Sequence, residues 1–382
     1  MHHHRKDSDA ATRAQFDELL KTFDFFKHHM AGYPSNQAFD YSPLFPALQY
    51  SINNIGDPFH DSNYTANTHE MERQVIYFFA ELMRLPHNQR WGYVTNGGTE
   101  GNLFGMYVGR ETIPNAITYF SEDVHYSIFK IVKLLQLKPV IIKSQPHGEM
   151  DYNDLLKRLR EHSKRPALIM ANIGTTMKGA VDDVVKIREA LHEAKIKQHY
   201  IHADCALSGM ILPFVEHPQP YGFDNGFDSC AISGHKMIGS PIPCGIALTR
   251  KPFINKIAQS IEYVEVLDTT IMGSRNAFTP LMLWYAIQKK GVSGFRDQVA
   301  KMLETAEYTV QAFQKHNIKS WRNKNSITCV FPRPHHDITR KWNIASQGNL
   351  SHIITVSHVT KEIVDQVIQD ILQDKGESIE LT

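Results

Sequence analysis

The sequence of 382 residues is poor in cysteine and carries almost no net charge. Its four cysteines, Cys205, Cys230, Cys244 and Cys329, are scattered along the chain and form no CxxC pair. This argues against a disulfide framework and predicts reduced thiols in a cytoplasmic protein. Lys and Arg total 41 against 40 Asp and Glu, so the net charge is +1 and we expect no attraction to nucleic acid or to an anionic membrane.

The sequence also lacks long apolar runs and metal-binding spacings. No uninterrupted apolar segment reaches the roughly 18 residues that a membrane span requires. The 21 histidines include the adjacent pairs His28-His29 and His335-His336, but neither pair is followed by a third ligand at the spacing of a zinc site. We therefore expect no bound metal, and a metal-binding protein without enzymatic activity is a weak alternative.

Short β-rich segments alternate with helical segments from about residue 91 onward. Such alternation is typical of a parallel sheet covered by helices on both faces. Segments 326–331 and 350–357 predict strands of a smaller C-terminal sheet. The expected strands of the main sheet are 91–95, 116–120, 139–142, 167–173, 199–204, 228–233 and 244–250, with helices near 98–110, 124–136, 151–162 and 183–194.

The first predicted helix, over residues 13–31, is amphipathic, and its apolar face consists of Phe16, Leu19, Leu20, Phe23 and Phe26. A helix so close to the chain terminus can bury this face against a second subunit. A second helix is predicted over residues 69–84. We expect three regions: an N-terminal helical arm over residues 1–50, a large domain over 51–280 and a small C-terminal domain over 281–382.

The first strand end resembles an anion-binding turn. Ligands of open parallel sheets bind beyond the carboxyl ends of the strands. After the strand at 91–95 come Gly97, Gly98 and Thr99, followed by a helix. Glycines let backbone N–H groups approach a phosphate, and the helix N-terminus favours negative charge. A tight structural turn explains these residues equally well, and the patterns GxxxxGK[ST] and GxGxxG of nucleotide sites are absent.

Later strand ends supply a histidine, an aspartate and a lysine. His125 follows the strand at 116–120, and Asp204 ends an apolar strand, where a carboxylate is costly to bury without a cation. Lys236 lies in the apolar, turn-rich segment SGHKMIGSPIPCG, where desolvation favours the neutral, nucleophilic amine. Pyridoxal 5′-phosphate needs this set: donors for its phosphate, a lysine for its aldehyde and a carboxylate for its pyridine nitrogen.

Six stretches of the chain carry a family resemblance: SINN (51–54), WGYVTNGGTEGN (91–102), NIGTTMKGAVDD (172–183), IHADCALSGM (201–210), SGHKMIGSPIPCG (233–245) and TIMGSRN (270–276). Together they resemble the group II pyridoxal-phosphate-dependent amino-acid decarboxylases of fold type I, within them the histidine decarboxylase subfamily, which includes plant serine decarboxylases. The resemblance runs from Gly32-Tyr33-Pro34 to the C-terminal helix. It implies an α/β fold with a mostly parallel seven-stranded sheet sandwiched by helices, a smaller α+β domain, and a homodimer with active sites at the interface.

The resemblance also assigns roles to matching positions. Lys236 would bind the cofactor's aldehyde, Asp204 would pair with its pyridine nitrogen, and His125 would stack on its ring beside the substrate. Tyr263 would help to protonate the product, although a tyrosine packed at a strand or loop edge explains this position nearly as well. The other cofactor contacts would be Gly97, Gly98, Thr99, Thr175, Thr176, His202, Ala206, Ser233 and His235, with Gly273 and Ser274 approaching the partner's phosphate site.

The implied reaction is α-decarboxylation of an L-amino acid to CO₂ and a primary amine. Ser326 matches a position near the substrate side chain in histidine decarboxylases, and a serine also occurs there in the plant serine enzymes. Residues 56–73 resemble the plant serine branch more than the bacterial histidine enzymes. L-Histidine and L-serine are therefore equally good candidates, and another fold type I enzyme, such as an aminotransferase or C–S lyase, is the alternative reaction class.

Overall fold

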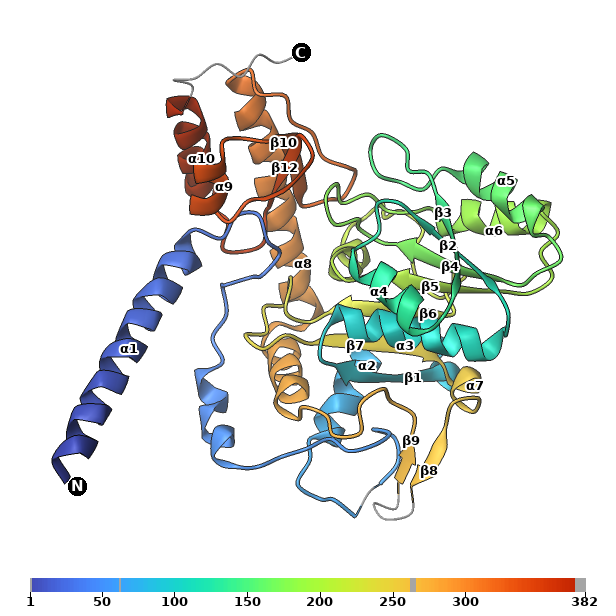
Figure 1. Ribbon diagram of the computed structural model, residues 1–382, viewed down its shortest axis with the longest axis horizontal. Helices are drawn as coiled ribbons and strands as arrows, with labels where there is room; N and C mark the ends of the chain where they lie inside the picture. Colours follow the sequence, from blue (N-terminus) through green and yellow to red (C-terminus); the bar gives the residue numbers. More distant parts are fainter. Residues whose placement is uncertain (1, 62, 262–265, 375–382) are drawn as a thin grey trace.

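A seven-stranded sheet forms the centre of the computed structural model, which describes residues 2–61, 63–261 and 266–374 (Figure 1). Its order is β1-β7-β6-β5-β4-β2-β3. β7 is antiparallel to both neighbours, and the other strands pair in parallel. The seven strands expected from the sequence are all present, as β1 (Arg90–Thr95), β2 (Ile117–Ser121), β3 (Lys138–Ile142), β4 (Ala167–Asn172), β5 (His199–Asp204), β6 (Ser229–Ser233) and β7 (Gly245–Arg250).

Helices connect these strands and cover the sheet. β2, β4 and β6 are buried along their whole length, as expected of strands covered on both faces. Two of the helices begin after Asp151 and Asp183, whose carboxylates accept hydrogen bonds from the first backbone N–H groups. The helices of this part are α2 (His69–Leu82), α3 (Gly98–Thr112), α4 (Ser127–Leu134), α5 (Tyr152–Glu161), α6 (Val184–Glu193) and α7 (Lys251–Ile254), with short 3₁₀ helices η1 (Ser42–Gln49), η2 (His87–Gln89), η3 (Ser208–Met210) and η4 (Leu212–Phe214).

A smaller antiparallel sheet with the order β10-β12-β11 forms the C-terminal part, which confirms the two strands expected there. The long helix α8 packs on α2 as well as on β10 and α10, so it links the two sheets. The division of the chain into three regions stays a prediction. The remaining elements are the ribbon β8 (Gln259–Ile261) and β9 (Val266–Asp268), then α8 (Phe278–Lys315), β10 (Thr328–Pro332), α9 (His336–Lys341), β11 (Ala345–Gln347), β12 (Leu350–Ile354) and α10 (Lys361–Gln373).

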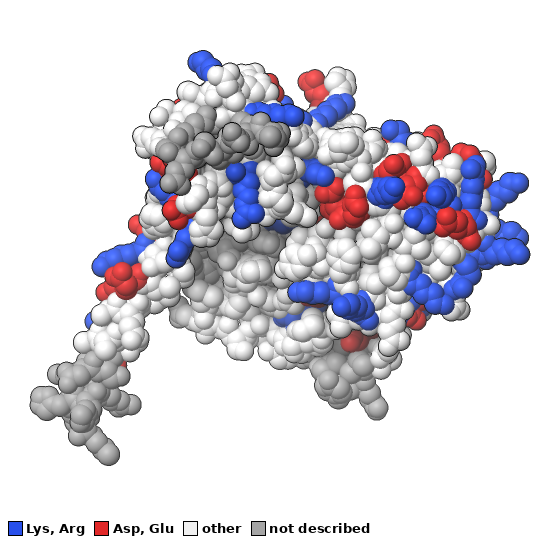
Figure 2. All heavy atoms as spheres, turned by 45° about the horizontal axis from the view of Figure 1, so that its top comes forward, with Lys and Arg blue, Asp and Glu red and all other residues white. Residues whose placement is uncertain are grey.

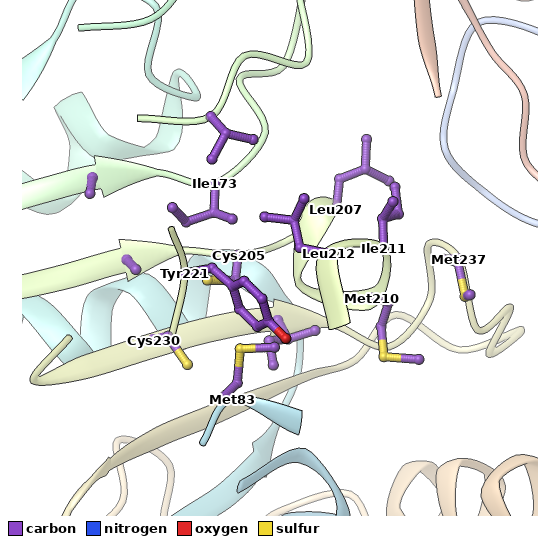
Figure 3. Close-up of a cluster of buried hydrophobic side chains, with 14 of the residues drawn as sticks. Met83, Ile173, Cys205, Leu207, Met210, Ile211, Leu212, Tyr221, Cys230 and Met237 are labelled. Atoms are coloured by element: carbon purple, nitrogen blue, oxygen red, sulfur yellow. The ribbon is translucent and has the colours of Figure 1, made fainter. Parts of the chain in front are cut away.

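The main apolar core continues to the carboxyl ends of β5 and β6. Figure 3 shows this portion, which includes Cys205 directly after β5, Cys230 on the neighbouring strand β6 and Met237 in the loop after β6. All four cysteines are free, as the sequence predicts, and all four are also buried. Each of the two residues Cys205 and Met237 directly follows a predicted site residue in the chain. The core therefore holds the backbone directly next to the site residues Asp204 and Lys236.

The N-terminal helix α1 (His2–His28) extends away from the rest of the chain (Figure 1). The predicted apolar face is present but uncovered within one chain, since the side chains of Phe16, Leu19, Leu20, Phe23 and Phe26 are 36–58% exposed.

Basic and acidic side chains lie next to each other on the face of the molecule shown in Figure 2. No helix in the described ranges is both long and apolar enough to cross a membrane, and the described residues contain no cluster of ligands suited to a metal ion.

Candidate active site

The turn between β1 and α3 opens the site. Gly97 has φ +150°, a conformation that L side chains rarely adopt, and a Cβ there would have no atom within 4 Å. The Glu100 carboxylate reaches back one turn to accept a hydrogen bond of 2.8 Å from the Asn96 backbone N–H. The N–H groups of Gly98 and Thr99, in the first turn of α3, have no acceptor within the helix. They form the positive end of the helix dipole, which suits a phosphate.

Ser233 and Ala206 pack against this turn beside Gly98. A Cβ on Gly98 would lie 2.9 Å from Ser233 Oγ and 3.7 Å from the Ala206 Cβ, so only glycine leaves room at this position. Ser233 ends β6, and its backbone N–H donates to Ala206 O over 3.3 Å. Gly97, Gly98, Thr99 and Ser233 therefore surround a small space with N–H and hydroxyl donors, and we call this group the phosphate cradle. Donors of this kind are what the sequence predicts for a phosphate site.

Asp204 ends β5 beside this cradle and is held by two donors. Asn102 Nδ2 donates to Asp204 Oδ2 over 2.9 Å, and the Ala206 backbone N–H donates to Asp204 Oδ1 over 3.0 Å. Asn102 Oδ1 in turn accepts from His202 Nε2 at 3.0 Å, while His202 Nδ1 lies 2.7 Å from Ser229 Oγ. Burial lowers the pKa of His202 to about 3, so its ring is neutral at physiological pH.

Lys236 follows β6 and faces the same cavity as Asp204. Burial lowers the pKa of the Lys236 amine, and the negative charge of Asp204 acts in the opposite direction. His125 has its Nδ1 2.8 Å from Ser127 Oγ, and burial lowers its pKa as well, with Asp204 raising it and Lys236 lowering it. The amine is therefore shifted toward the neutral form that a nucleophile requires.

His235 and Thr175 complete the polar lining. His235 Nδ1 donates to Cys244 O over 2.7 Å, and burial lowers the pKa of its ring. Thr175 Oγ1 accepts a hydrogen bond of 3.0 Å from the Ala180 backbone N–H, which fixes the turn after β4. Both contacts orient side chains whose other atoms face the cavity.

These groups line one cavity of about 350 Å³. Several lining residues had no predicted role, and they come from segments distant in the chain. The sequence did contain a signal for Asn102, because this residue lies four positions after Gly98 and therefore on the same face of α3. The predicted residues that line the cavity are Gly97, Gly98, Thr99, His125, Thr175, Thr176, Asp204, Ala206, Ser233, His235 and Lys236, and those without a prediction include Gly32, Tyr33, Pro34, Asn102, Leu207, Ala345, His352 and Ile354.

Other predicted residues lie away from this lining. His202 is fully buried beneath Asn102 rather than on the cavity wall. Ser326 is buried, and its Oγ accepts from the Thr328 backbone N–H over 3.0 Å. Ser274 Oγ accepts a hydrogen bond of 3.1 Å from Asn53 Nδ2. Neither Ser274 nor Gly273 lines the cavity of its own chain. Tyr263 lies outside the described residues, so its role stays a prediction.

The donor set fits pyridoxal 5′-phosphate. The N-terminus of α3 and Ser233 suit a phosphate dianion, and the absence of a Cβ at Gly97 and Gly98 leaves it space. Lys236 offers an amine shifted toward neutrality. Asp204, bound by two N–H donors, offers a carboxylate that can hold a proton on the pyridine nitrogen.

Comparisons with known proteins agree with this chemistry. Residues 46–331 match the pyridoxal-dependent decarboxylase conserved domain. Histidine decarboxylase of Morganella morganii is 48% identical over 346 residues, covering 90% of this chain and 92% of that protein, and the Pseudomonas fluorescens enzyme is 48% identical over 347 residues, covering 90% and 86%. L-Methionine decarboxylase of Streptomyces sp. 590 shares the fold with a TM-score of 0.88 and 23% identity, covering 96% of this chain and 95% of that one.

The match to the conserved domain and the identity to these relatives both extend over most of the chain. The fold is that of fold type I pyridoxal-phosphate enzymes, with the cavity beyond the carboxyl ends of the central strands. The chain belongs to the pyridoxal-dependent decarboxylase family, and it is a histidine decarboxylase-like carboxy-lyase that uses pyridoxal 5′-phosphate.

Proposed function

We propose that this protein removes the α-carboxylate of L-histidine and releases histamine and CO₂. The observation that carries the proposal is the convergence of Lys236, Asp204 and the N-terminus of α3 on one cavity. L-Histidine is favoured over L-serine because the relatives that share 46–48% identity over 90% of this chain are histidine decarboxylases.

We assign each of the main residues of the cavity a separate role in this reaction. Bound pyridoxal 5′-phosphate supplies the electron sink that accepts the electron pair of the breaking C–C bond. Lys236 would hold the cofactor through its amine, which burial shifts toward the neutral, nucleophilic form. Asp204 would keep a proton on the pyridine nitrogen, and its hydrogen bonds from Asn102 and Ala206 hold the carboxylate in place for that role. His125 lines the same cavity and would lie against the cofactor ring, where it would limit the access of water.

The lining of the cavity also favours decarboxylation over transamination. An aminotransferase binds the substrate carboxylate with an arginine, whereas a decarboxylase leaves that group free to depart as CO₂. Among the described residues, those lining the cavity include no arginine. Arg275 is the arginine of the TIMGSRN stretch, and its guanidinium is paired instead with the buried Glu72 carboxylate.

We also propose that the working form is a homodimer. The exposed apolar face of α1, formed by Phe16, Leu19, Leu20, Phe23 and Phe26, supports this because burying it against a second copy would remove a large apolar area from water. The segment with Gly273 and Ser274 lies outside the cavity of its own chain, which leaves it available to the partner's phosphate site.

The cytoplasm is the proposed location of the protein. The four cysteines are all buried and free, which suits a reducing compartment. A test is the thiol content of the protein isolated from its own cells under alkylating conditions, which should be four free thiols per chain.

A panel of free L-amino acids tests the proposed reaction. The holoenzyme is incubated with each amino acid, and amines and keto acids are identified by mass spectrometry. We expect histamine from L-histidine and no amine from the Lys236→Ala variant. Ethanolamine from L-serine, without histamine, would replace the proposed substrate but retain the reaction. A keto acid in place of an amine would overturn decarboxylation itself.

A further inference from the structure

An extended segment, residues 29–37, binds the C-terminal sheet; we call it the N-terminal strap. Its main chain pairs with that part of the fold at Ala31, whose N–H donates to Trp342 O over 3.0 Å and whose carbonyl accepts from the Ile354 N–H over 2.8 Å. His352 Nε2 lies 2.9 Å from Gly32 O. The strap is therefore fixed along the small sheet, where Gly32 and its two successors reach the cavity.

A second histidine holds both ends of the strap. His358 Nε2 donates to Met30 O over 2.7 Å, and His358 Nδ1 accepts from the Gln37 backbone N–H over 3.2 Å. These two contacts require the neutral ring with its proton on Nε2. Asn343 Nδ2 adds a hydrogen bond of 2.9 Å to His29 O. The path of the strap is thus determined from its first residue to its last.

Asn36 joins the strap to the segment that carries Lys236. Its backbone N–H donates to Lys236 O over 3.2 Å, and its Nδ2 donates to Met237 O over 3.0 Å. Its Oδ1 accepts from the Ala38 backbone N–H over 2.9 Å. Asn36 is 1% exposed, so these bonds are shielded from water. One residue therefore binds two successive carbonyl groups of the lysine segment.

The same segment is held from its other side. Gln298 of α8 donates through Nε2 to Met237 O over 3.1 Å and to Ser357 Oγ over 2.8 Å. The Met237 side chain is buried in the main core (Figure 3). Because carbonyl groups on both sides of the Met237 nitrogen are bound, the direction of the chain at Lys236 is fixed, and with it the direction of the Lys236 side chain.

We infer that Asn36 is a positioning residue that orients the Lys236 amine toward the cofactor. This inference rests on the role proposed for Lys236. Asn36 does not line the cavity, so it acts through the main chain of the lysine segment. Loss of the Nδ2 bond would leave Met237 O bound by Gln298 alone. The backbone bond from Asn36 N–H to Lys236 O would remain, so the fold is preserved while the peptide that follows Lys236 is held less firmly on the strap side.

Two variants and one control test this role. Asn36→Ala removes the side-chain bonds, and the isosteric Asn36→Asp replaces the donor to Met237 O with an oxygen while retaining the acceptor for Ala38 N–H. Gln37→Ala is the matched control, because among the described residues the Gln37 side chain bonds only to Ser35 O, within the strap, and its backbone contact to His358 is retained. Far-UV circular dichroism establishes that each variant is folded.

The readouts are the pH titration of the visible absorbance of the bound cofactor, the steady-state constants, and borohydride reduction followed by peptide mapping. We expect both Asn36 variants to shift the midpoint of the absorbance titration and to lower kcat by about 10- to 100-fold, as misplacement of a reacting group does, with a smaller change in KM. Gln37→Ala should match the wild type in all three.

The outcomes separate this inference from the proposed function. Borohydride reduction links the cofactor permanently to its lysine, and we call this link the label. If the label is on Lys236 but both Asn36 variants keep the titration and the kcat of the wild type, the inference alone is overturned. The same losses in Gln37→Ala as in Asn36→Ala would also overturn it, since the strap as a whole would then be responsible. Label on a different lysine would overturn the role of Lys236, and the inference with it.

Discussion

Asn102 Nδ2 donates a hydrogen bond to Asp204 Oδ2 over 2.9 Å, which connects the phosphate cradle to the carboxylate of the site. Asn102 stands in the second turn of α3, whose N-terminus forms the cradle, and Asp204 ends β5. The amide is itself fixed by His202 on its other side. The groups that would hold the two ends of the cofactor are therefore linked and cannot move independently of each other.

The first prediction concerns this amide. Asn102→Ala leaves Asp204 Oδ2 and His202 Nε2 without their partner in a buried place, so the free energy of unfolding should fall by about 1–3 kcal/mol. We also expect weaker cofactor binding, because the carboxylate is less well oriented. Equilibrium dialysis of the cofactor and chemical denaturation measure the two effects. Glu111→Ala, near the end of the same helix, is the control, and an equal loss in both variants would contradict the assigned role.

The second prediction concerns the ion pair of Arg275 and Glu72, whose side chains are 1% and 0% exposed. Arg275 also donates to Gly56 O over 2.8 Å, and Glu72 accepts from the Val94 N–H over 2.8 Å just before the cradle. Arg275→Met leaves a buried carboxylate without its cation, so the free energy of unfolding should fall by about 3–5 kcal/mol.

Chemical denaturation of the cofactor-free protein at one concentration measures this loss. The control is Arg160→Met, since Arg160 and Glu193 form a pair with side chains 57% and 59% exposed. Exposed pairs contribute about 1 kcal/mol or less. Similar losses in the two variants would show that burial does not determine the importance of the Arg275 pair.

The third prediction concerns pH and His202. Its pKa is about 3 in the folded chain against about 6.5 when unfolded, so the unfolded chain binds the extra proton between these values. The free energy of unfolding should therefore fall as pH drops below about 6.5, by up to ~1.4 kcal/mol per pH unit from this residue. NMR of ring-labelled histidine should show no titration of His202 from pH 8 to 5. A midpoint near 6.5 would contradict the buried neutral ring.

The fourth prediction concerns α1 and the dimer. Leu20→Glu places a charge in the apolar face that we expect to be covered by a second copy. The dissociation constant of the dimer should therefore rise, so that on dilution the variant separates into monomers at a protein concentration at which the wild type is still dimeric. Light scattering across a dilution series measures the change. Lys21→Glu puts the same residue outside that face and should leave the dimer intact. A wild-type protein that stays monomeric at every concentration would refute the homodimer.

The sequence predicted the elements of the fold that depend on local patterns. Most of the apolar segments became strands that are buried in the sheet, whereas the edge strand β3 is largely exposed. The strand ends at Asp204 and Ser233 met because parallel strands place their carboxyl ends together. The helix at 13–31 was also predicted correctly in type, and α1 begins earlier, at His2. Its apolar face stays exposed because a single chain lacks the surface that would cover it.

The parts of the site that could not be predicted come from contacts between distant segments. Asn36 lies 200 residues before Lys236, and no periodicity connects them. His352 lines the cavity where β12 lies beside the strap, and this contact has no local signal in the sequence. Ser326 was expected beside the substrate from the resemblance, yet within this chain it is buried next to Gly179, so its role stays a prediction.

The most direct test of the central claim is turnover of L-histidine labelled with ¹³C in its carboxylate, carried out in D₂O with the holoenzyme. We predict equal amounts of ¹³CO₂ and histamine, with one deuterium on the carbon that lost the carboxylate, and neither product from Lys236→Ala. L-Histidine that exchanges its α-hydrogen but retains the ¹³C label would contradict decarboxylation, as would ¹³CO₂ released at the wild-type rate by Lys236→Ala.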